Sequence, residues 1–365
     1  MKIGYCYFSD EILKSEVITS GKKDICDFCK KCEFIYDTEV DKYLENFFNE
    51  FVDIFTPVES IPGFPMEDGI LLKTEIATNW NIFTEKNDKE IYKIITDICR
   101  DKFKQRPEIF NLPVTIGKLN DVEYVKRHSL LKNDWEDFVD DIKYNNRFHT
   151  NHVNKRLLEK YCATILKTYE AGMIFYRCRI INDTKAKISF QEIGAPPRDS
   201  ATDGRANSRG ISRLYLSSSE KTTLHETRAG LYDSVAIGKF KLKKKMIVVD
   251  LKKINQISPF QEDIFDNIVE LAINKKHFKK IDAEMGKVMR KNDDTLDYLA
   301  TQYIADFVKS IVSKDDQNEK NLYDGIEFRS VMDSNGYNLA IFDPSIFEVE
   351  CIENKNVCHI SYEYE

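Results

Sequence analysis

The sequence lacks several features, and each absence narrows the class of protein. No apolar run approaches the roughly 18 residues that a membrane-spanning helix requires, and residues 1–10 have neither the basic start nor the apolar stretch of a secretory signal. The nine cysteines are odd in number and scattered over 365 residues, so they do not suit a disulfide framework. We therefore expect a cytoplasmic protein without a membrane partner, in which most cysteines are buried thiols.

A broad excess of positive charge is also absent. The net charge is −7, with 25 basic against 31 acidic residues over 1–170 and 29 against 30 over 171–365. This balance offers little attraction to a polyanionic backbone, so no nucleic-acid partner is expected. One local exception is a group of six arginines, namely Arg177, Arg179, Arg198, Arg205, Arg209 and Arg213. Guanidinium groups at this density suit a compact anion.

Length and patterning predict two domains of different character. A chain of 365 residues exceeds what one hydrophobic core usually fills, since domains cluster near roughly 100–150 residues. Apolar residues recur at helical intervals within 41–170, and this pattern stops near Gly172. Residues 173–180 are then rich in β-branched and aromatic side chains, which indicates a strand. A domain boundary near 165–172 follows.

The fold class expected from this pattern is α+β, with an α-rich N-terminal domain before a mixed, mostly antiparallel sheet. Further strands are expected at 213–216, 236–242, 246–251, 325–330 and 337–342, and helices at 260–273 and 295–313. The expected division is a cysteine-bearing segment 1–40, a helical domain 41–170, a sheet domain 171–350, and a tail or edge strand 351–365.

A long loop within the sheet domain carries the densest chemical signal. Residues 194–210 are crowded with Gly, Pro, Ser, Asp and Asn, and a loop of this length in a compact domain usually has a function. Its glycines allow close approach of the backbone to a ligand, and a pyrophosphate would fit its arginines. Tyr215 and Glu226 follow the loop. An aromatic ring and a carboxylate are the groups that a positively charged ring leaving a ribose requires.

At these residues the sequence resembles the RES domain family. The resemblance rests on an ordered series of short motifs: Tyr176-Arg177, Gly-Ala-Pro-Pro at 194–197, Gly204-Arg205-Ala206-Asn207, Leu214-Tyr215-Leu216, Thr223-Leu224-His225-Glu226, Val249-Asp250-Leu251, and Tyr-Asp-Gly-Ile-Glu-Phe-Arg-Ser at 323–330. It covers about 173–345. The sequence departs from the commonest pattern at Ala206, where an aromatic residue is frequent, which affects one packing contact and not the chemistry.

The resemblance implies a fold like that of ADP-ribosyltransferases and consumption of NAD⁺ as substrate by phosphorolysis or hydrolysis. Many members are toxins of toxin–antitoxin pairs, so an antitoxin or regulatory protein is an expected partner, and some relatives transfer ADP-ribose to a protein. The implied catalytic residues are Glu226, Arg177, Tyr215 and Ser330, and the implied NAD⁺-binding residues are Arg205, Asn207, Arg179 and Gly204. Arg177 and Arg205 would hold phosphates, Tyr215 would contact nicotinamide, and Glu226 would support the ribose cation. Arg177 and Arg179 compete for the family's first arginine.

Two other motifs leave alternatives open. Cys26, Cys29 and Cys32 form a C-x-x-C-x-x-C run that, with Cys6, could supply four thiolates to zinc, although the same cysteines could be free thiols. The helical region of RES proteins with such a cysteine-bearing start is described as HEPN-like. The pair Arg147 and His152 has the Arg-x4-His spacing of HEPN ribonucleases. The rival hypotheses are therefore a ribonuclease and a binding module with an inactive pocket.

Overall fold

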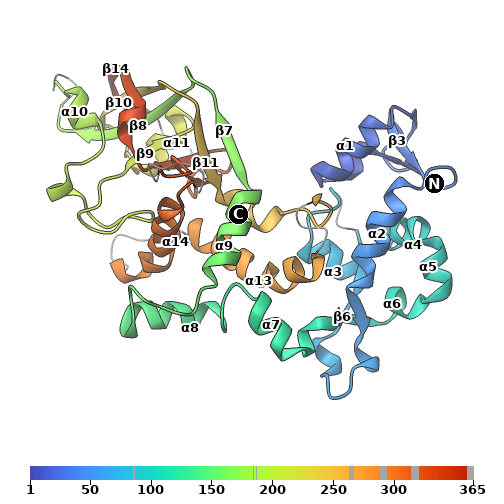
Figure 1. Ribbon diagram of the computed structural model, residues 1–365. Coiled ribbons are helices and arrows are strands. Elements are labelled where there is room, and N and C mark those ends of the chain that lie inside the picture. The colour runs from blue at the N-terminus through green and yellow to red at the C-terminus, as the bar shows by residue number, and fades with distance from the viewer. Residues whose placement is uncertain are drawn as a thin grey trace. The chain divides into compact units, whose positions relative to one another are not determined.

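The structure is a computed structural model that describes residues 1–84, 87–183, 185, 187–262, 267–287, 294–313 and 320–359, apart from the side chains of residues 32 and 33. The chain divides into two compact units (Figure 1). Unit 1 contains residues 1–129 and 256–276, and unit 2 contains residues 130–255 and 277–365. The division of the chain near residue 170, inferred from the sequence, stays a prediction.

Unit 1 contains two small antiparallel sheets. One has the order β1 (Lys2–Gly4), β3 (Cys32–Asp37), β2 (Lys23–Ile25), and the other has the order β4 (Phe55–Pro57), β6 (Pro113–Ile116), β5 (Ile70–Leu71). None of these strands was predicted from the sequence. Most of them are too short for a period of two to stand out from the surrounding residues.

The helices of unit 1 bury the apolar stripes that the sequence predicted. They are α1 (Glu11–Thr19), α2 (Tyr43–Asp53), α3 (Leu72–Asn79), α4 (Asp88–Ile98), α5 (Arg100–Gln105), α6 (Pro107–Asn111) and α7 (Val122–His128). In α2 the buried residues include Phe48 and Phe51, which lie on one face because helical neighbours recur every three or four residues. Their rings lie 5.4 and 5.9 Å from the ring of Phe260, so aromatic packing holds the segment 256–276 in this unit.

Unit 2 is built on one eight-stranded sheet, which confirms the mixed, mostly antiparallel α+β class. The strand order is β14-β10-β8-β9-β13-β12-β11-β7, and every neighbouring pair is antiparallel except β11 with β12. The strands are β7 (Leu166–Tyr169), β8 (Ile174–Ile181), β9 (Leu214–Ser217), β10 (Ser234–Leu242), β11 (Met246–Asp250), β12 (Gly325–Arg329), β13 (Tyr337–Ile341) and β14 (Phe347–Asn356). The edge strand expected beyond residue 350 is thus the end of β14.

Unit 2 also contains the helices α8 (Trp135–Asp140), α9 (Lys155–Thr164), α10 (Phe190–Ile193), α11 (Glu220–Glu226) and α14 (Leu299–Ser310). Helix α13 (Ile268–Met285) begins in unit 1, and its residues from 277 onward belong to unit 2. Two expectations differ from this result. Within the helix expected at 260–273, Glu262 is helical and α13 begins at Ile268 after a turn at Asn267, with residues 263–266 outside the described part of the chain. The helix expected to continue toward Gly172 ends at Thr164, because Leu166–Tyr169 pairs with β11 and buries Tyr169 instead.

The sheet is weakly joined between β8 and β9. These strands pair at a single position, Tyr176 with Ser217, whereas β8 pairs with β10 along nearly its whole length. Helix α11 packs on both β8 and β9, and the hydroxyl of Thr223 accepts a hydrogen bond of 2.9 Å from the backbone N–H of Cys178. The divergence of two strands beneath one helix leaves room for a hollow at this junction.

Among the described residues, no helix has the length and apolar character needed to cross a bilayer.

Candidate active site

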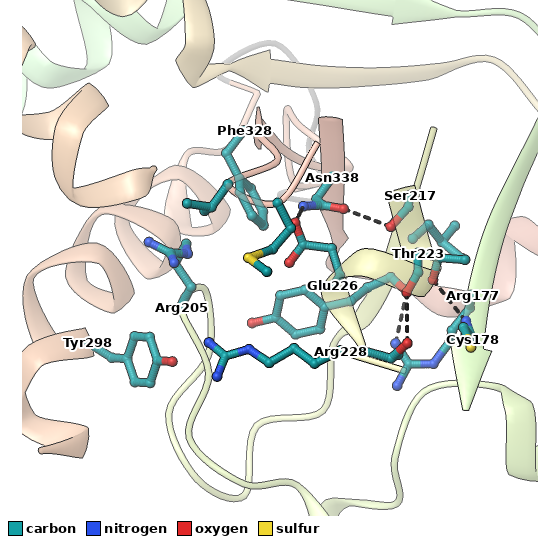
Figure 2. A pocket seen from close by; sticks show the side chains of 15 residues that line it. Arg177, Cys178, Arg205, Ser217, Thr223, Glu226, Arg228, Tyr298, Phe328 and Asn338 are labelled. Atoms are coloured by element: carbon teal, nitrogen blue, oxygen red, sulfur yellow. Dashed lines mark hydrogen bonds between the residues drawn. The ribbon is translucent and has the colours of Figure 1, made fainter. Parts of the chain in front are cut away.

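Four predicted site residues line one cavity in unit 2, although they come from separate stretches of the sequence (Figure 2). Arg177 lies in β8, Arg205 in the loop before β9, Tyr215 in β9, and Glu226 at the end of α11. The cavity has a volume of about 340 Å³, which is within the usual range for a small-molecule site. The structure therefore brings these side chains together around a space that a ligand can enter.

The carboxylate of Glu226 is held by two hydrogen-bond donors. Its Oε1 atom accepts hydrogen bonds of 2.6 Å from the hydroxyl of Ser330 and 2.9 Å from Nδ2 of Asn338. The amide of Asn338 is itself oriented, because its Oδ1 accepts a hydrogen bond of 2.7 Å from the hydroxyl of Ser217 (Figure 2). Glu226 Oε2 has no hydrogen-bond partner among the described residues. One carboxylate oxygen is thus fixed by the protein and the other is available to a ligand.

Helix α11 places this carboxylate because the helix is fixed at its start and in its middle. At the start of the helix, the hydroxyl of Ser219 accepts a hydrogen bond of 3.0 Å from the backbone N–H of Thr222, which satisfies an otherwise unpaired donor. Within the helix, the contact from Thr223 to β8 prevents rotation about the helix axis. Glu226 occupies the last helical position. A short, capped helix therefore carries the acid to the cavity from a fixed direction.

Arg177 is a partly buried cation without a carboxylate partner among the described residues. Its Nη1 donates a hydrogen bond of 2.8 Å to the backbone oxygen of Tyr215, and its Nε is buried without a partner. Burial, together with repulsion from Arg179, lowers the pKa of Arg177 to about 10, so the group stays protonated at neutral pH. A buried charge without a counter-ion is costly. The cost would be offset by an anionic ligand in the cavity.

The loop that carries Arg205 is closed by a tight turn. The backbone N–H of Gly204 donates to the oxygen of Asn207, and Nε2 of Gln302 donates to the backbone oxygens of both residues, each at 2.9 Å. The hydroxyl of Tyr215 donates to Oδ1 of Asn207 at 2.7 Å and accepts a hydrogen bond from the backbone N–H of Ala206. Burial raises the pKa of Tyr215 to about 12, so its hydroxyl stays protonated. The tyrosine hydroxyl therefore fixes the loop, and only its ring can serve a ligand.

Arg205 projects from this turn toward the end of α13. Its Nη1 donates to the backbone oxygen of Glu284 at 2.6 Å, and its Nη2 donates to that of Lys287. Carbonyl groups at the end of a helix attract a cation, because they carry the negative end of the helix dipole. Burial lowers the pKa of Arg205, opposed by the nearby Tyr298 and Glu226. The guanidinium is therefore anchored on one side and lines the cavity on the other.

The structure places four further predicted residues around the site but outside its lining. Ser330 acts on Glu226 and is buried. Asn207 is buried, and both its amide oxygen and its amide nitrogen are used within the loop. Gly204 forms the tight turn. Arg179 donates to the backbone oxygen of Gly194 at 3.4 Å, so of the two competing arginines only Arg177 lines the cavity.

The lining residues that were not predicted as site residues include Asn338, Arg228 and Tyr298. Asn338 is a buried polar residue in the strand β13, and this contrast with its apolar neighbours was a usable signal. Arg228 has a positive φ of 52° directly after α11, which no sequence pattern indicated. In Figure 2, Arg205 and Tyr298 lie on the side of the view away from Ser217, and the side chain of Arg228 extends toward that side.

The rival ribonuclease motif lies elsewhere in unit 2. Arg147 lines a second cavity of about 250 Å³, and its guanidinium donates to the backbone oxygens of Ile142 and Lys143, both at 3.3 Å. His152 is not among the described residues that line this cavity, and its Nδ1 is buried without a hydrogen-bond partner in the described part of the chain. Ribonuclease activity through this pair stays a prediction.

Gly204→Ala is expected to lower the free energy of unfolding by about 1–3 kcal/mol, as overpacking typically does. An added Cβ would lie 2.6 Å from Oδ1 of Asn207 and 2.9 Å from the hydroxyl of Tyr215, so the turn would have to open. Urea titration measures the loss. The matched control is Gly230→Ala, where the new Cβ meets its nearest atom at 3.4 Å and little change is expected. Equal effects at both positions would contradict the account of the turn.

A known protein family matches the part of the chain that contains this cavity. A family model described as the RES domain matches residues 174–365, which is more than half of the chain. The match begins at the first residue of β8 and includes all the residues that line the cavity. No curated protein and no solved structure matches the chain.

Proposed function

This chain belongs to the RES domain family, and from that premise we propose that its C-terminal domain binds NAD⁺ and cleaves the bond between nicotinamide and ribose. Membership of this family implies a toxin-like function that involves NAD⁺. The main support for cleavage of this bond is the position of the Glu226 carboxylate. Ser330 and Asn338 hold it in one cavity with Arg177 and Arg205. A fixed negative charge beside two partly buried cations matches a substrate that is cationic at the reacting end and anionic at its pyrophosphate.

In the proposed reaction, the ring nitrogen of nicotinamide leaves with the electron pair of the bond to ribose. The departing ring becomes neutral, and positive charge develops on the ribose carbon, as in glycoside hydrolysis. Glu226 Oε2 would face the ribose hydroxyls and stabilise this charge without reorganisation, since Oε1 is already fixed. An oxygen of water or of inorganic phosphate then bonds to the carbon, and its proton goes to solvent. The products are nicotinamide with ADP-ribose or its phosphate ester.

The remaining groups have complementary roles in the proposal. Arg177 and Arg205 would hold the pyrophosphate, because each is a partly buried cation that lines the cavity and makes no hydrogen bond to a carboxylate of the described residues. The ring of Tyr215 would lie against nicotinamide, since aromatic faces attract cations. Its hydroxyl is already engaged with Asn207 and would not take part in the chemistry. Ser330 and Asn338 act as positioning residues through Glu226.

The acceptor decides which activity the protein has, and product analysis distinguishes the acceptors. The full chain is incubated with NAD⁺ in three arms, namely without phosphate, with inorganic phosphate, and with a protein extract. Free nicotinamide is expected in each arm that contains an acceptor the enzyme can use. ADP-ribose indicates hydrolysis, a phosphate ester that forms only in the second arm indicates phosphorolysis, and ADP-ribose bound to protein indicates transferase activity. Intact NAD⁺ in all three arms would refute the proposal.

We further propose that the protein acts as a toxin or defence effector that depletes NAD⁺, and that an antitoxin or regulatory protein restrains it. The support is the family's association with toxin–antitoxin systems. A cell that expresses such an enzyme without restraint would lose NAD⁺ and stop growing. The N-terminal region would then dock a partner or sense a signal.

A further inference from the structure

The cysteines considered for zinc lie in unit 1, and their described side chains do not form a metal site. The Sγ atoms of Cys6 and Cys29 are 3.7 Å apart, and Cys26 is completely buried. The side chain of Cys32 lies outside the described part of the structure, and the described residues contain no group of three or more metal ligands. Zinc binding by these cysteines stays a prediction.

A second cavity, of about 250 Å³, lies in unit 2 and shares its wall with helix α14. The lining residues of this helix recur at intervals of three and four, so they form a single helical face. They are Leu299, Gln302, Tyr303, Asp306, Phe307 and Ser310. Residues between them, including Ile304 and Val308, are buried. Helix α14 therefore packs with one face in the core and presents the other to the cavity.

Three aromatic side chains line the second cavity. Tyr303 and Phe307 come from α14, and Phe148 follows the helical turn Asp141–Asn145. The ring of Tyr303 is fixed by an edge-on contact with the ring of Phe138, with 5.4 Å between their centres. Phe148 is 80% exposed, so a ligand that covers its ring would gain from removing apolar surface from water. Aromatic faces and edges of this kind suit a planar ring.

The hydroxyl of Tyr303 provides a second, independent observation. It is buried and has no hydrogen-bond partner among the described residues. Buried polar groups are nearly always paired, because an unpaired one has lost its water without a replacement. A polar atom of a ligand in the cavity would supply the missing partner.

The charges around the second cavity favour an anion. Arg147 and Lys155 line it and are exposed, and neither forms an ion pair with a carboxylate of the described residues. Among the described lining residues the one carboxylate is Asp306, which is already paired with Arg213 at 3.1 Å. Two cations without a counter-ion at the cavity match one anionic group on a ligand.

The second cavity is connected to the active site through Gln302. This residue is buried, and its Oε1 accepts a hydrogen bond of 2.9 Å from the hydroxyl of Ser208, which also lines the second cavity. Its Nε2 donates to the backbone oxygens of Gly204 and Asn207 in the turn that positions Arg205. One side chain thus contacts the space of the second cavity and holds the loop of the first.

We propose that the second cavity binds a small planar anion, an aromatic ring with one phosphate or carboxylate group, and that this ligand strengthens NAD⁺ binding through Gln302. The ring would lie against Tyr303 and Phe307, and the anionic group would face Arg147 and Lys155. A filled cavity prevents Gln302 from rotating away from the loop, so less order has to be imposed when NAD⁺ binds. Only this coupling rests on the proposed function, and ligand binding does not.

Calorimetric titration of the full-length protein with uridine monophosphate, and separately with benzoate, tests the site. Neither ring occurs in NAD⁺, and the two arms distinguish a nucleotide from an aromatic carboxylate. Saturable binding of at least one ligand is expected. Tyr303→Phe should weaken it about 2- to 12-fold, the usual contribution of one hydrogen bond. No binding of either ligand, or unchanged affinity in Tyr303→Phe, would overturn the proposal.

Lys155→Gln tests the charge, and Arg156→Gln is its matched control. Both residues are exposed neighbours in α9, but only Lys155 lines the second cavity. Lys155→Gln should weaken binding of the anion, whereas Arg156→Gln should bind it like the wild type. Arg177→Met should also bind it normally. Loss of binding in Arg177→Met alone would place the ligand in the active site and overturn the proposal.

The coupling is measured as the affinity for NAD⁺ in Glu226→Gln, with and without a saturating amount of the ligand that binds. A rise of at least about 5-fold is expected, the lower end of usual coupling between two sites. Unchanged or lower affinity would overturn the coupling. If NAD⁺ does not bind at all, the proposed function fails, whereas the titrations above still decide whether the second site exists.

Discussion

Glu226→Gln is expected to reduce the rate of NAD⁺ cleavage by roughly 10²- to 10³-fold, the usual cost of removing one preorganised electrostatic group from an active site. The substitution keeps the shape of the side chain and an oxygen that Ser330 and Asn338 can still donate to, so the fold should be retained. It removes the negative charge that would face the ribose cation. Release of nicotinamide under saturating NAD⁺ measures the rate, and circular dichroism checks the fold.

Glu220→Gln is the matched control for this experiment. Glu220 is the first residue of the same helix, α11, and its carboxylate forms ion pairs with Lys355 at 2.7 Å and Lys239 at 3.8 Å, away from the cavity lining. Partly exposed pairs of this kind contribute about 0–1 kcal/mol, so activity should be unchanged. A full rate in Glu226→Gln, or an equal loss in both variants, would contradict the proposed role of Glu226.

Arg177→Met is expected to weaken NAD⁺ binding about 10- to 150-fold, because a hydrogen bond to a charged group contributes about 1.5–3 kcal/mol. The same change should leave the stability of the ligand-free protein unchanged or raise it. The native guanidinium is partly buried without a carboxylate partner among the described residues, and methionine fills similar space without a charge to desolvate. Calorimetric titration of NAD⁺ in a Glu226→Gln background measures binding without turnover, and urea unfolding measures stability.

Arg179→Met provides the comparison on the same strand. Arg179 points to the backbone oxygen of Gly194 and does not line the cavity, so its loss should change NAD⁺ affinity little. If Arg179→Met weakened NAD⁺ binding more than Arg177→Met, then Arg179 and not Arg177 would be the phosphate-binding arginine. A large loss of stability in Arg177→Met would show that this arginine mainly supports the sheet.

The sequence was informative where function depends on short local motifs. Arg177, Tyr215 and Glu226 each lie in a motif of two to four residues, at a strand or a helix end that local patterning could place. The strand at 173–180 was recognised by its β-branched and aromatic residues, and it and the other strands expected in the sheet agree with the structure within one or two residues. The α+β class followed from the change from helical spacing to strand-like segments after Gly172 and was confirmed.

Other parts of the site depend on pairing between distant residues, which one sequence does not reveal. Asn338 reaches Glu226 because β13 pairs with β9, a contact between segments more than one hundred residues apart. Arg205 was predicted as a phosphate ligand, but its contacts with the carbonyls at 284 and 287 arise only from tertiary packing. The strands of unit 1 have two to six residues and too little alternation to recognise.

The most direct test is the fate of the nicotinamide ring when the purified full-length protein meets NAD⁺ labelled in that ring. The proposed chemistry predicts free labelled nicotinamide, released in step with the disappearance of NAD⁺ and abolished together with it in Glu226→Gln. Disappearance of NAD⁺ while the label stays attached to ribose, as in cleavage of the pyrophosphate, would contradict the proposed chemistry, and so would full recovery of intact NAD⁺ with every acceptor present.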